Sequence, residues 1–253
     1  MKKRVIFDVG HPAQVHNFKH IYWDLIKNGG EALFTAKDKE VTINLLESYT
    51  LPYVIIGKST KSMLSKLINI PLSFFKFFKI LGSYKPDIVV CRFSMHSTWC
   101  SFIMRIPVIG LADTEHTKLS DLLTVRYADT KLTSESYLKD LGRNHFRFNS
   151  NIEMFYLHPN RFQTTSSKIF EILNLKFNSN YVVVRFVSWS AHHDVGERGF
   201  NENQKIKLID ILRKKYSVFI TSEGPLSEDL KKYKININPD LMHEVLAFAS
   251  LYV

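Results

Sequence analysis

The sequence predicts an α/β protein built on parallel sheets and organised as two Rossmann-like domains. Through most of the 253 residues, short apolar runs rich in β-branched residues alternate with stretches of helical periodicity. Two such regions are joined by an irregular segment at 143–165, rich in Asn, His and aromatic residues, which is typical of a linker or crossover. We therefore expect an N-terminal domain at 1–145, a linker at 146–165 and a C-terminal domain at 166–253.

The first strand, loop and helix lie within residues 4–18 and the helix that follows. The apolar run at 5–7 is too short for a helix and suits a parallel strand covered on both faces. Gly10 and Pro12 end this strand. Apolar residues then recur three and four positions apart over 15–26, which predicts a helix that an Asn-Gly-Gly sequence ends.

The loop after this strand is the first candidate site, because ligands of open α/β sheets bind at the carboxyl ends of the strands. Asp8 ends the strand, Gly10 and His11 form the loop, and His16 opens the helix. A histidine in such a position either caps the helix and bonds to the backbone or acts in proton transfer. Both interpretations stay open here.

The same reasoning places the remaining elements in order. Further strands are expected at 31–36, 53–57, 87–91, 107–111, 130–133, 181–186, 217–221 and 235–237, with another opening at 251–253. Further helices are expected at 39–49, 61–81, 97–104, 119–127, 135–141, 166–173, 202–215, 226–233 and 239–249.

The stretch at 61–81 has the strongest amphipathic pattern in the chain. Its apolar face is formed by Leu64, Leu67, Ile68, Phe75 and Phe78, and its basic face by Lys61, Lys66, Lys76 and Lys79. It is either a helix that covers the sheet or, with Phe74 and Phe77 beside the apolar face, a helix attracted to an anionic membrane. Pro71 is expected to start or kink this helix.

Composition limits the partners and the compartment. The net charge of +10 favours anionic partners such as an acidic membrane surface or phosphorylated metabolites. Nucleic acid is not expected, because the basic residues are dispersed and no recognition motif occurs. Cys91 and Cys100 form no disulfide or metal pattern, which favours a reduced, cytoplasmic protein. The basic start does not read as a signal peptide, and no stretch is long and apolar enough to span a bilayer.

Asp113, Glu115 and His116 form the densest titratable cluster in the first half of the chain, directly after the fifth expected strand. A carboxylate beside an imidazole can orient a general base and raise its basicity. The alternative is that Asp113 is only a helix cap or turn residue.

A second candidate region begins at Arg185, at the end of an apolar strand. A guanidinium there is expected either to face an anion such as a diphosphate or to pair with Asp194 or Glu197. The loop that follows offers hydroxyls, histidines and backbone amides suited to phosphate, in particular Ser188, Trp189, Ser190, His192 and Asp194. No metal is expected, because adjacent histidines point apart and no further ligand spacing occurs. The dinucleotide and P-loop glycine motifs are absent.

Four blocks of the chain, in order, resemble a prokaryotic domain-of-unknown-function family of GT-B-like proteins. The blocks are 7–18 (FDVGHPAQVHNF), 113–116 (DTEH), 183–185 with 189–194 (VVR, WSAHHD) and 242–249 (MHEVLAFA). The resemblance implies a GT-B fold related to sugar-nucleotide glycosyltransferases and non-hydrolysing UDP-N-acetylglucosamine 2-epimerases. Members of that family continue into a strand and a Gly/Thr-rich loop that this chain, ending at Val253, does not contain, so we expect an incomplete second domain.

The resemblance implies no established reaction, and our first functional hypothesis is a glycosyltransferase of cell-surface or other polysaccharide or glycoconjugate biosynthesis. It would use a sugar nucleotide, UDP-linked, as substrate and no separate cofactor, with the acceptor on the first domain and the donor on the second. His16, or Glu115 with His116, would be the base, and the region from Arg185 would hold the donor. A 2-epimerase or a non-catalytic carbohydrate-binding protein of this fold are the alternatives. The expected location is the cytoplasm or the inner face of the membrane, where an acceptor could be lipid-linked.

Overall fold

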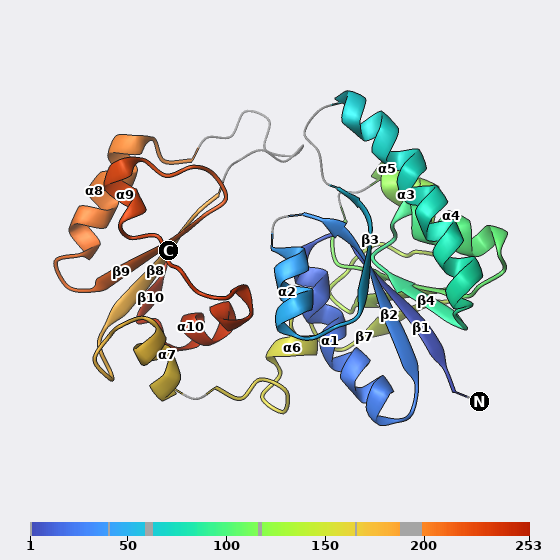
Figure 1. Ribbon diagram of the computed structural model, residues 1–253, viewed down its shortest axis with the longest axis horizontal. Coiled ribbons are helices and arrows are strands. Elements are labelled where there is room, and N and C mark those ends of the chain that lie inside the picture. Colours follow the sequence, from blue (N-terminus) through green and yellow to red (C-terminus); the bar gives the residue numbers. More distant parts are fainter. Residues whose placement is uncertain (1, 40, 59–62, 116–117, 165, 188–198) are drawn as a thin grey trace. The chain divides into compact units, whose positions relative to one another are not determined.

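The computed structural model describes residues 2–39, 41–58, 63–115, 118–164, 166–187 and 199–253 (Figure 1). The chain divides into two compact units, Met1–Gln163 and Thr164–Val253, and each contains a parallel sheet flanked by helices. The expected α/β class is thus confirmed.

The sheet of the first unit has seven parallel strands in the order β3-β2-β1-β4-β5-β6-β7. The strands are β1 (Arg4–Val9), β2 (Glu31–Asp38), β3 (Tyr53–Lys58), β4 (Ile88–Cys91), β5 (Val108–Ala112), β6 (Thr130–Ser134) and β7 (His145–Phe148). The helices are α1 (Pro12–Lys27), α2 (Thr42–Ser48), α3 (Met63–Tyr84), α4 (Met95–Ile103), α5 (Lys118–Thr124), a 3-10 turn (Val125–Tyr127) and α6 (Met154–Leu157).

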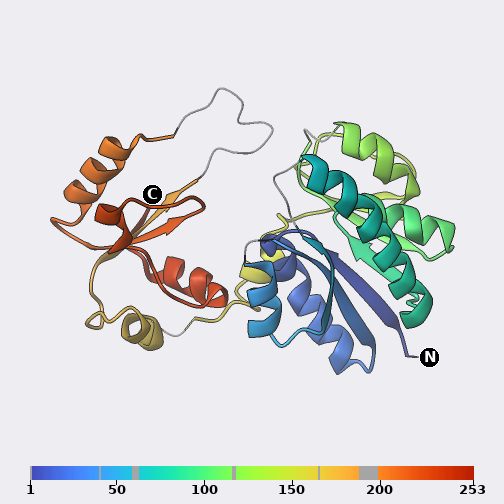
Figure 2. The ribbon, with the colours of Figure 1, turned by 45° about the horizontal axis from the view of Figure 1, so that its top comes forward.

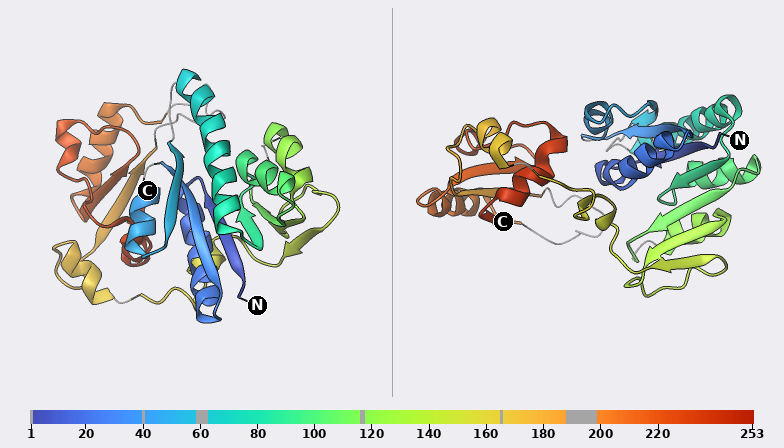
Figure 3. Two further views of the ribbon diagram at one scale, coloured as in Figure 1. Left: turned by 45° about the vertical axis from the view of Figure 1, so that its right-hand side comes forward. Right: turned by 90° about the horizontal axis from the view of Figure 1, so that it is seen from below.

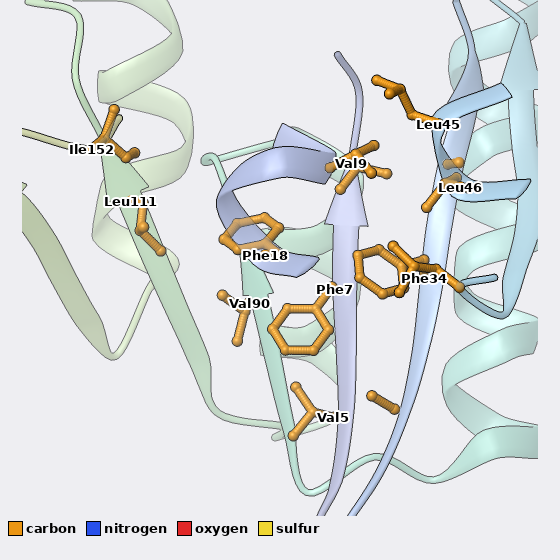
Figure 4. Close-up of a cluster of buried hydrophobic side chains, with 14 residues drawn as sticks. Val5, Phe7, Val9, Phe18, Phe34, Leu45, Leu46, Val90, Leu111 and Ile152 are labelled. Carbon is orange, nitrogen blue, oxygen red and sulfur yellow. The ribbon is translucent and has the colours of Figure 1, made fainter. Parts of the chain in front are cut away.

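Different helices cover the two faces of this sheet. On one face, Phe7 of β1 stacks on Phe18 of α1, with ring centroids 5.4 Å apart, and on Phe34 of β2 at 5.2 Å (Figure 4). The next residue back, Ile6, lies in the cluster on the opposite face with Phe77 of α3. Because β1 is buried on both faces, its apolar run has no alternation, as a central parallel strand requires.

The helix α3 continues through Pro71 but buries a different face from the expected one. Phe77 is fully buried and Phe74 packs against the same cluster, whereas Phe75 is 70% and Phe78 44% exposed. The expectation that Phe75 and Phe78 face the sheet is therefore wrong. The side chains that do face the sheet, Phe74 and Phe77, each lie one residue earlier, which corresponds to a rotation of about 100° around the helix axis. The side chains of Leu64, Leu67 and Ile68, also expected on the apolar face, are outside those that the structure describes.

The helix expected at 135–141 does not form. The backbone amide of Leu138 donates to Oε1 of Glu115 at 2.6 Å, and Gly142 then turns the chain with a φ of +81°. Because this amide bonds to a carboxylate distant in sequence rather than to the preceding turn, the helical pattern of hydrogen bonds is interrupted there.

The first unit extends past the boundary expected at residue 145. The strand β7 pairs with β6, and α6 packs against α1. A strand and a helix of four residues each are too short to produce a recognisable periodicity, so the sequence of this region resembles a linker.

Residues 149–163, called here the return segment, lead from β7 at the edge of the sheet back to α1. The ring of Tyr156 in α6 lies 5.4 Å from that of His16. Further along, the guanidinium of Arg161 donates to both carboxylate oxygens of Asp24, at 3.1 and 2.7 Å. The last part of this unit is therefore fastened to its first helix.

One close approach inside the sheet involves Gly110 of β5 and Phe93, which follows β4. Phe93 has a φ of +50°, in the left-handed region that non-glycine residues rarely adopt. Its ring fills the place of a side chain on Gly110, since a Cβ there would lie 2.2 Å from Cε1 of Phe93. Glycine is required at this position for space.

The second unit contains a three-stranded parallel sheet in the order β10-β8-β9. Its elements are α7 (Ser166–Ile172), β8 (Tyr181–Phe186), α8 (Glu202–Leu212), β9 (Ser217–Ser222), α9 (Glu228–Lys231), a 3-10 turn (Pro239–Leu241), α10 (Met242–Phe248) and β10 (Leu251–Tyr252). The strand expected to open at 251–253 is confirmed. The one expected at 235–237 is wrong, because the chain there makes a single bridge between Lys234 and Ile220.

Candidate functional site

The centre of the first sheet has the geometry of a ligand site. β1 and β4 are neighbours, and the strands that follow each of them lie on opposite sides, which creates the switch point where open α/β sheets bind ligands. In the loop after β1, the amide of Gly10 donates to Oε1 of Gln14 at 2.6 Å. Nδ1 of His11 accepts from the amide of Ala13 at 3.2 Å, so this histidine caps α1.

Asp8 lies directly beneath this loop in a polar network, called here the Asp8 network. Thr35 Oγ1 of β2 donates to its Oδ1 at 2.7 Å, and Ser94 Oγ donates to its Oδ2 at 2.5 Å. Nε2 of His96, in the first turn of α4, lies 3.1 and 3.0 Å from the two oxygens. Ser97 completes the network, 2.7 Å from Ser94.

The Asp8 network contains an ionised carboxylate in the interior. Burial alone would raise the pKa of Asp8, but the neighbouring His96 and the hydrogen bonds from Ser94 and Ser97 outweigh it and hold this pKa well below its usual range. Asp8 and His96 are only 2% and 4% exposed. The network therefore positions the loops after β1 and β4 rather than contacting a ligand.

Sequence reasoning identified Asp8 but missed His96 and the two serines. Asp113 follows β5 immediately, whereas Ser94, His96 and Ser97 come three to six residues after the end of β4. The sequence signal was weak, because these residues lie near a strand end but their partner Asp8 is 86 to 88 residues earlier.

His16 is buried and lies among aromatic rings. Its Nδ1 is 3.3 Å from the hydroxyl of Tyr49, and its ring contacts those of Tyr49 and Tyr156. With 8% of its surface exposed, it has the environment of a core histidine of α1.

Asp113 and Glu115 both make structural contacts at the carboxyl end of β5. Asp113 forms an ion pair with Arg92, which follows β4, so the two strand ends are joined by opposite charges. Glu115 accepts from Leu138, as described above, and its carbonyl accepts from Lys139. His116 lies outside the described residues.

The same carboxylates line a pocket of about 220 Å³, called here the carboxyl-edge pocket. Its lining is polar, apart from two apolar residues, and consists of Ala112, Asp113, Thr114, Glu115, Ser134, Ser136, Tyr137, Asn151, Ile152 and Glu153. Burial, with the nearby charges of Asp121, Glu115 and Asp113, raises the pKa of Tyr137, which therefore keeps its proton. Within the described part of the chain its buried hydroxyl has no hydrogen-bond partner. Carboxylates and hydroxyls of this kind suit a ligand that carries many hydroxyl groups.

In the second unit, Arg185 forms an ion pair with Glu223, whereas the two partners expected for it, Asp194 and Glu197, lie outside the described residues. Its Nη2 donates to Oε1 of Glu223 at 2.7 Å, and its side chain is half exposed. Register explains this, because Arg185 lies opposite Thr221 on β9 and Glu223 follows two residues later. Because the guanidinium is half exposed, it keeps part of its hydration, and the free-energy cost of its position is lower than that of a buried charge.

The other donor candidates, Ser188, Trp189, Ser190, His192 and Asp194, lie outside the described residues. In the part of the chain that is described, no three His, Cys, Asp or Glu side chains are placed to hold a metal ion.

Solved structures of two sugar-nucleotide or glycosyl-transfer enzymes share this fold. The UDP-GlcNAc 2-epimerase of Methanocaldococcus jannaschii is 13% identical with a TM-score of 0.65, over 98% of this chain and 77% of that chain. The same epimerase in complex with UDP-GlcNAc and UDP is 12% identical with a TM-score of 0.59, over 99% of this chain and 73% of that chain. SsfS6, a glycosyltransferase of Streptomyces sp. SF2575, is 12% identical with a TM-score of 0.54, over 99% of this chain and 75% of that chain. The expected GT-B fold is confirmed by these likenesses.

Relatives by sequence are consistent with the resemblance first noticed in the four blocks. An uncharacterized protein of Methanocaldococcus jannaschii is 28% identical over 155 residues, which are 59% of this chain and 46% of that protein. The chain thus spans about half the length of the curated relative that it matches. Residues 3–231 match a family described as protein of unknown function (DUF354), and since the match covers most of the sequence, this chain belongs to the DUF354 family.

Proposed function

We propose that this protein is a glycosyltransferase that uses a UDP-linked sugar nucleotide in polysaccharide or glycoconjugate biosynthesis. The observation that carries the proposal is the carboxyl-edge pocket, which gathers carboxylates and hydroxyls at the strand ends of a GT-B sheet. The fold shared with SsfS6 and with an epimerase solved with UDP-GlcNAc supports a sugar nucleotide as the ligand.

In this proposal the first unit binds the acceptor and supplies the base. Glu115, followed in the chain by His116, takes the proton of the acceptor hydroxyl, and the Arg92 ion pair holds Asp113 in the same pocket as Glu115. The burial of His16 argues against direct contact with an acceptor, so His16 is the second choice. The second unit binds the donor, with Arg185 and the loop that follows stabilising the departing diphosphate.

The location we propose is the cytoplasm or the inner face of the membrane. Both cysteines are buried free thiols, as suits a reducing compartment. The acceptor we propose is accordingly one made in that compartment, free or lipid-linked.

A second candidate function is a UDP-sugar 2-epimerase of the same fold. It is favoured by the carboxylates of Asp113, Glu115 and Glu153, which all line one pocket and could remove a sugar proton and return it. No separate acceptor would be needed. The protein would then exchange a sugar proton with solvent while the nucleotide stays bound to the protein.

A panel of nucleotides tests both functions. UDP and UDP-sugars should raise the melting temperature of the full chain saturably, whereas ADP-sugars should not, because binding to the native state alone stabilises it. The protein is then incubated in D₂O with the UDP-sugar that stabilised it and with no acceptor. Incorporation of deuterium into the sugar under these conditions would identify the epimerase. Release of UDP that depends on an added acceptor would identify the transferase. If no nucleotide sugar shifts the melting temperature, both functions are rejected.

The Glu115→Gln variant tests the base. We expect turnover to fall on the order of a hundredfold with an unchanged melting temperature, because the glutamine carbonyl can still accept from Leu138 while proton transfer is lost. Glu228→Gln, on a side chain 86% exposed in the second unit, is the matched control and should keep full turnover. Wild-type turnover in Glu115→Gln would place the base elsewhere.

The Arg185→Ala variant tests the donor site. We expect affinity for UDP to fall by a factor of roughly ten to a hundred, the scale of a lost hydrogen bond to a charged group. Arg213→Ala is the control, because Arg213 is also a half-exposed arginine of the second unit in an ion pair, with Asp210. Equal UDP affinity in the two folded variants would reject a donor role for Arg185.

A further inference from the structure

The outer face of α3 and the end of α4 carry large apolar side chains that the fold does not bury. Phe75 is 70%, Phe102 60% and Ile103 67% exposed, with Phe78 at 44%. The inner face of α3 already covers the sheet through Phe77. Phe102 meets the ring of Tyr127 edge to face, with centroids 5.1 Å apart, but none of the four exposed residues belongs to the buried cluster on this face of the sheet. We call these four residues the aromatic face.

The aromatic face belongs to one layer of the first unit. The helices α3 and α4 lie side by side on the same face of the sheet (Figures 2 and 3). At their contact, the rings of Phe74 and Trp99 are 6.0 Å apart, and the thiol of Cys100 lies 3.7 Å from the carbonyl of Phe74. Phe78 comes one turn after Phe74 in α3, and Ile103 comes one turn after Trp99 in α4, so each helix carries exposed apolar residues within about one turn of this contact.

Positive charge concentrates around this layer. Basic residues occur along the whole chain, but residues 58–112 contain eight Lys and Arg against one acidic residue, Asp87. No Asp or Glu occurs in α3 or α4. Among the described side chains of this layer, Lys79 and Arg105 are exposed and Lys76 is half-buried. The aromatic face therefore has a basic surround without an acidic residue in either helix.

We propose that the aromatic face docks on the surface of an anionic phospholipid bilayer, with the aromatic rings in the interface and the basic side chains at the headgroups. Exposed rings flanked by Lys and Arg are the combination that interfacial helices use. The basic surround matches an anionic surface, because each Lys or Arg near such a surface adds to the attraction. No described helix is long and apolar enough to cross a membrane, so the contact is with the surface. This inference does not depend on the proposed function.

Vesicle co-sedimentation of the full chain tests the docking. We expect binding to phosphatidylcholine vesicles containing phosphatidylglycerol, little binding to pure phosphatidylcholine, and a loss of binding as salt is raised. Lys76→Glu/Lys79→Glu should weaken binding by roughly twenty-five-fold or more, since each charge near such a surface contributes about fivefold. Phe75→Ser/Phe102→Ser should weaken it by about tenfold or more, through lost apolar contact.

Matched controls come from exposed side chains elsewhere in the chain. Lys207→Glu/Lys214→Glu makes the same charge change in the second unit, and Leu138→Ser/Ile211→Ser removes apolar side chains that are 83% and 55% exposed. Both should bind vesicles as the wild type does. Equal binding by aromatic-face and control variants would overturn the proposal, as would absence of binding to either vesicle. If instead the wild type dimerises in sedimentation and Phe75→Ser/Phe102→Ser abolishes dimerisation without changing vesicle binding, the face is covered by a second copy and the proposal is wrong.

Discussion

Replacing Asp8 by Asn tests whether the buried network supports the first unit. Each carboxylate oxygen faces a donor, Thr35 or Ser94, and both face Nε2 of His96. Whichever way the asparagine amide turns, its NH₂ group replaces an oxygen that accepts from Thr35 or Ser94, so that hydroxyl must turn to accept instead, and the negative charge beside His96 is lost. Breaking a buried pair by removing one partner costs about 3 kcal/mol or more.

Hydrogen exchange read by mass spectrometry gives the assay, because peptides from β1 and β4 report opening of the first unit alone. A loss of about 3 kcal/mol corresponds to roughly hundredfold faster exchange of the slowest β1 amides. Asp24→Asn is the control, since it makes the same change in a half-exposed pair with Arg161 and should leave β1 exchange nearly unaltered. Equal exchange rates in Asp8→Asn and the wild type would refute the reasoning.

The pH dependence gives an independent test of the same pair. The folded-state pKa of Asp8 is lowered relative to the unfolded chain. Its contribution to stability is therefore complete above the ordinary carboxyl pKa of about 3.9 and is lost as the pH falls from there toward the folded-state value. We expect the difference in stability between the wild type and Asp8→Asn to shrink below pH about 4. A difference that stays constant down to pH about 2 would show that charge is not its source.

Two further predictions concern the interior of the first unit. Gly110→Ala should lower the free energy of unfolding, measured by urea titration, by about 1 to 3 kcal/mol, because the new Cβ meets the rigid ring of Phe93. An unchanged urea midpoint would contradict this close approach. Burial raises the pKa of Cys91 to about 12 and that of Cys100 to about 11. Both thiols should therefore resist a disulfide reagent at pH 8 in the folded protein and react fully in denaturant. Fast reaction without denaturant would contradict their burial.

Local patterns were sufficient to predict most strands but not the orientation of every helix. In α3, both Phe74 with Phe77 and Phe75 with Phe78 are apolar pairs at helical spacing. Periodicity therefore finds the helix, yet it cannot tell which pair faces the sheet, and only the position of the sheet decides.

The parts of the candidate site that sequence reasoning missed depend on partners distant in the chain. His96 becomes meaningful only beside Asp8, 88 residues earlier, and Glu223 pairs with Arg185 only because two strands align. By contrast, Asp113 and Glu115 could be proposed from the sequence, because the rule that parallel strands present their carboxyl ends at one edge needs no knowledge of the neighbours.

The return segment has a mechanical consequence for the chain. The strand β7 lies at the edge of the sheet and pairs with a strand on one side only, so a pull applied directly to its end would break its ladder to β6 one hydrogen bond at a time. The chain leaves this unit at Gln163, two residues after the paired Arg161. A force transmitted from the second unit therefore acts first on the Arg161–Asp24 pair and then on Ile152, which is 5% exposed in the core beside α1. Such a load therefore reaches the contacts with α1 and the buried Ile152 before it reaches the edge strand β7.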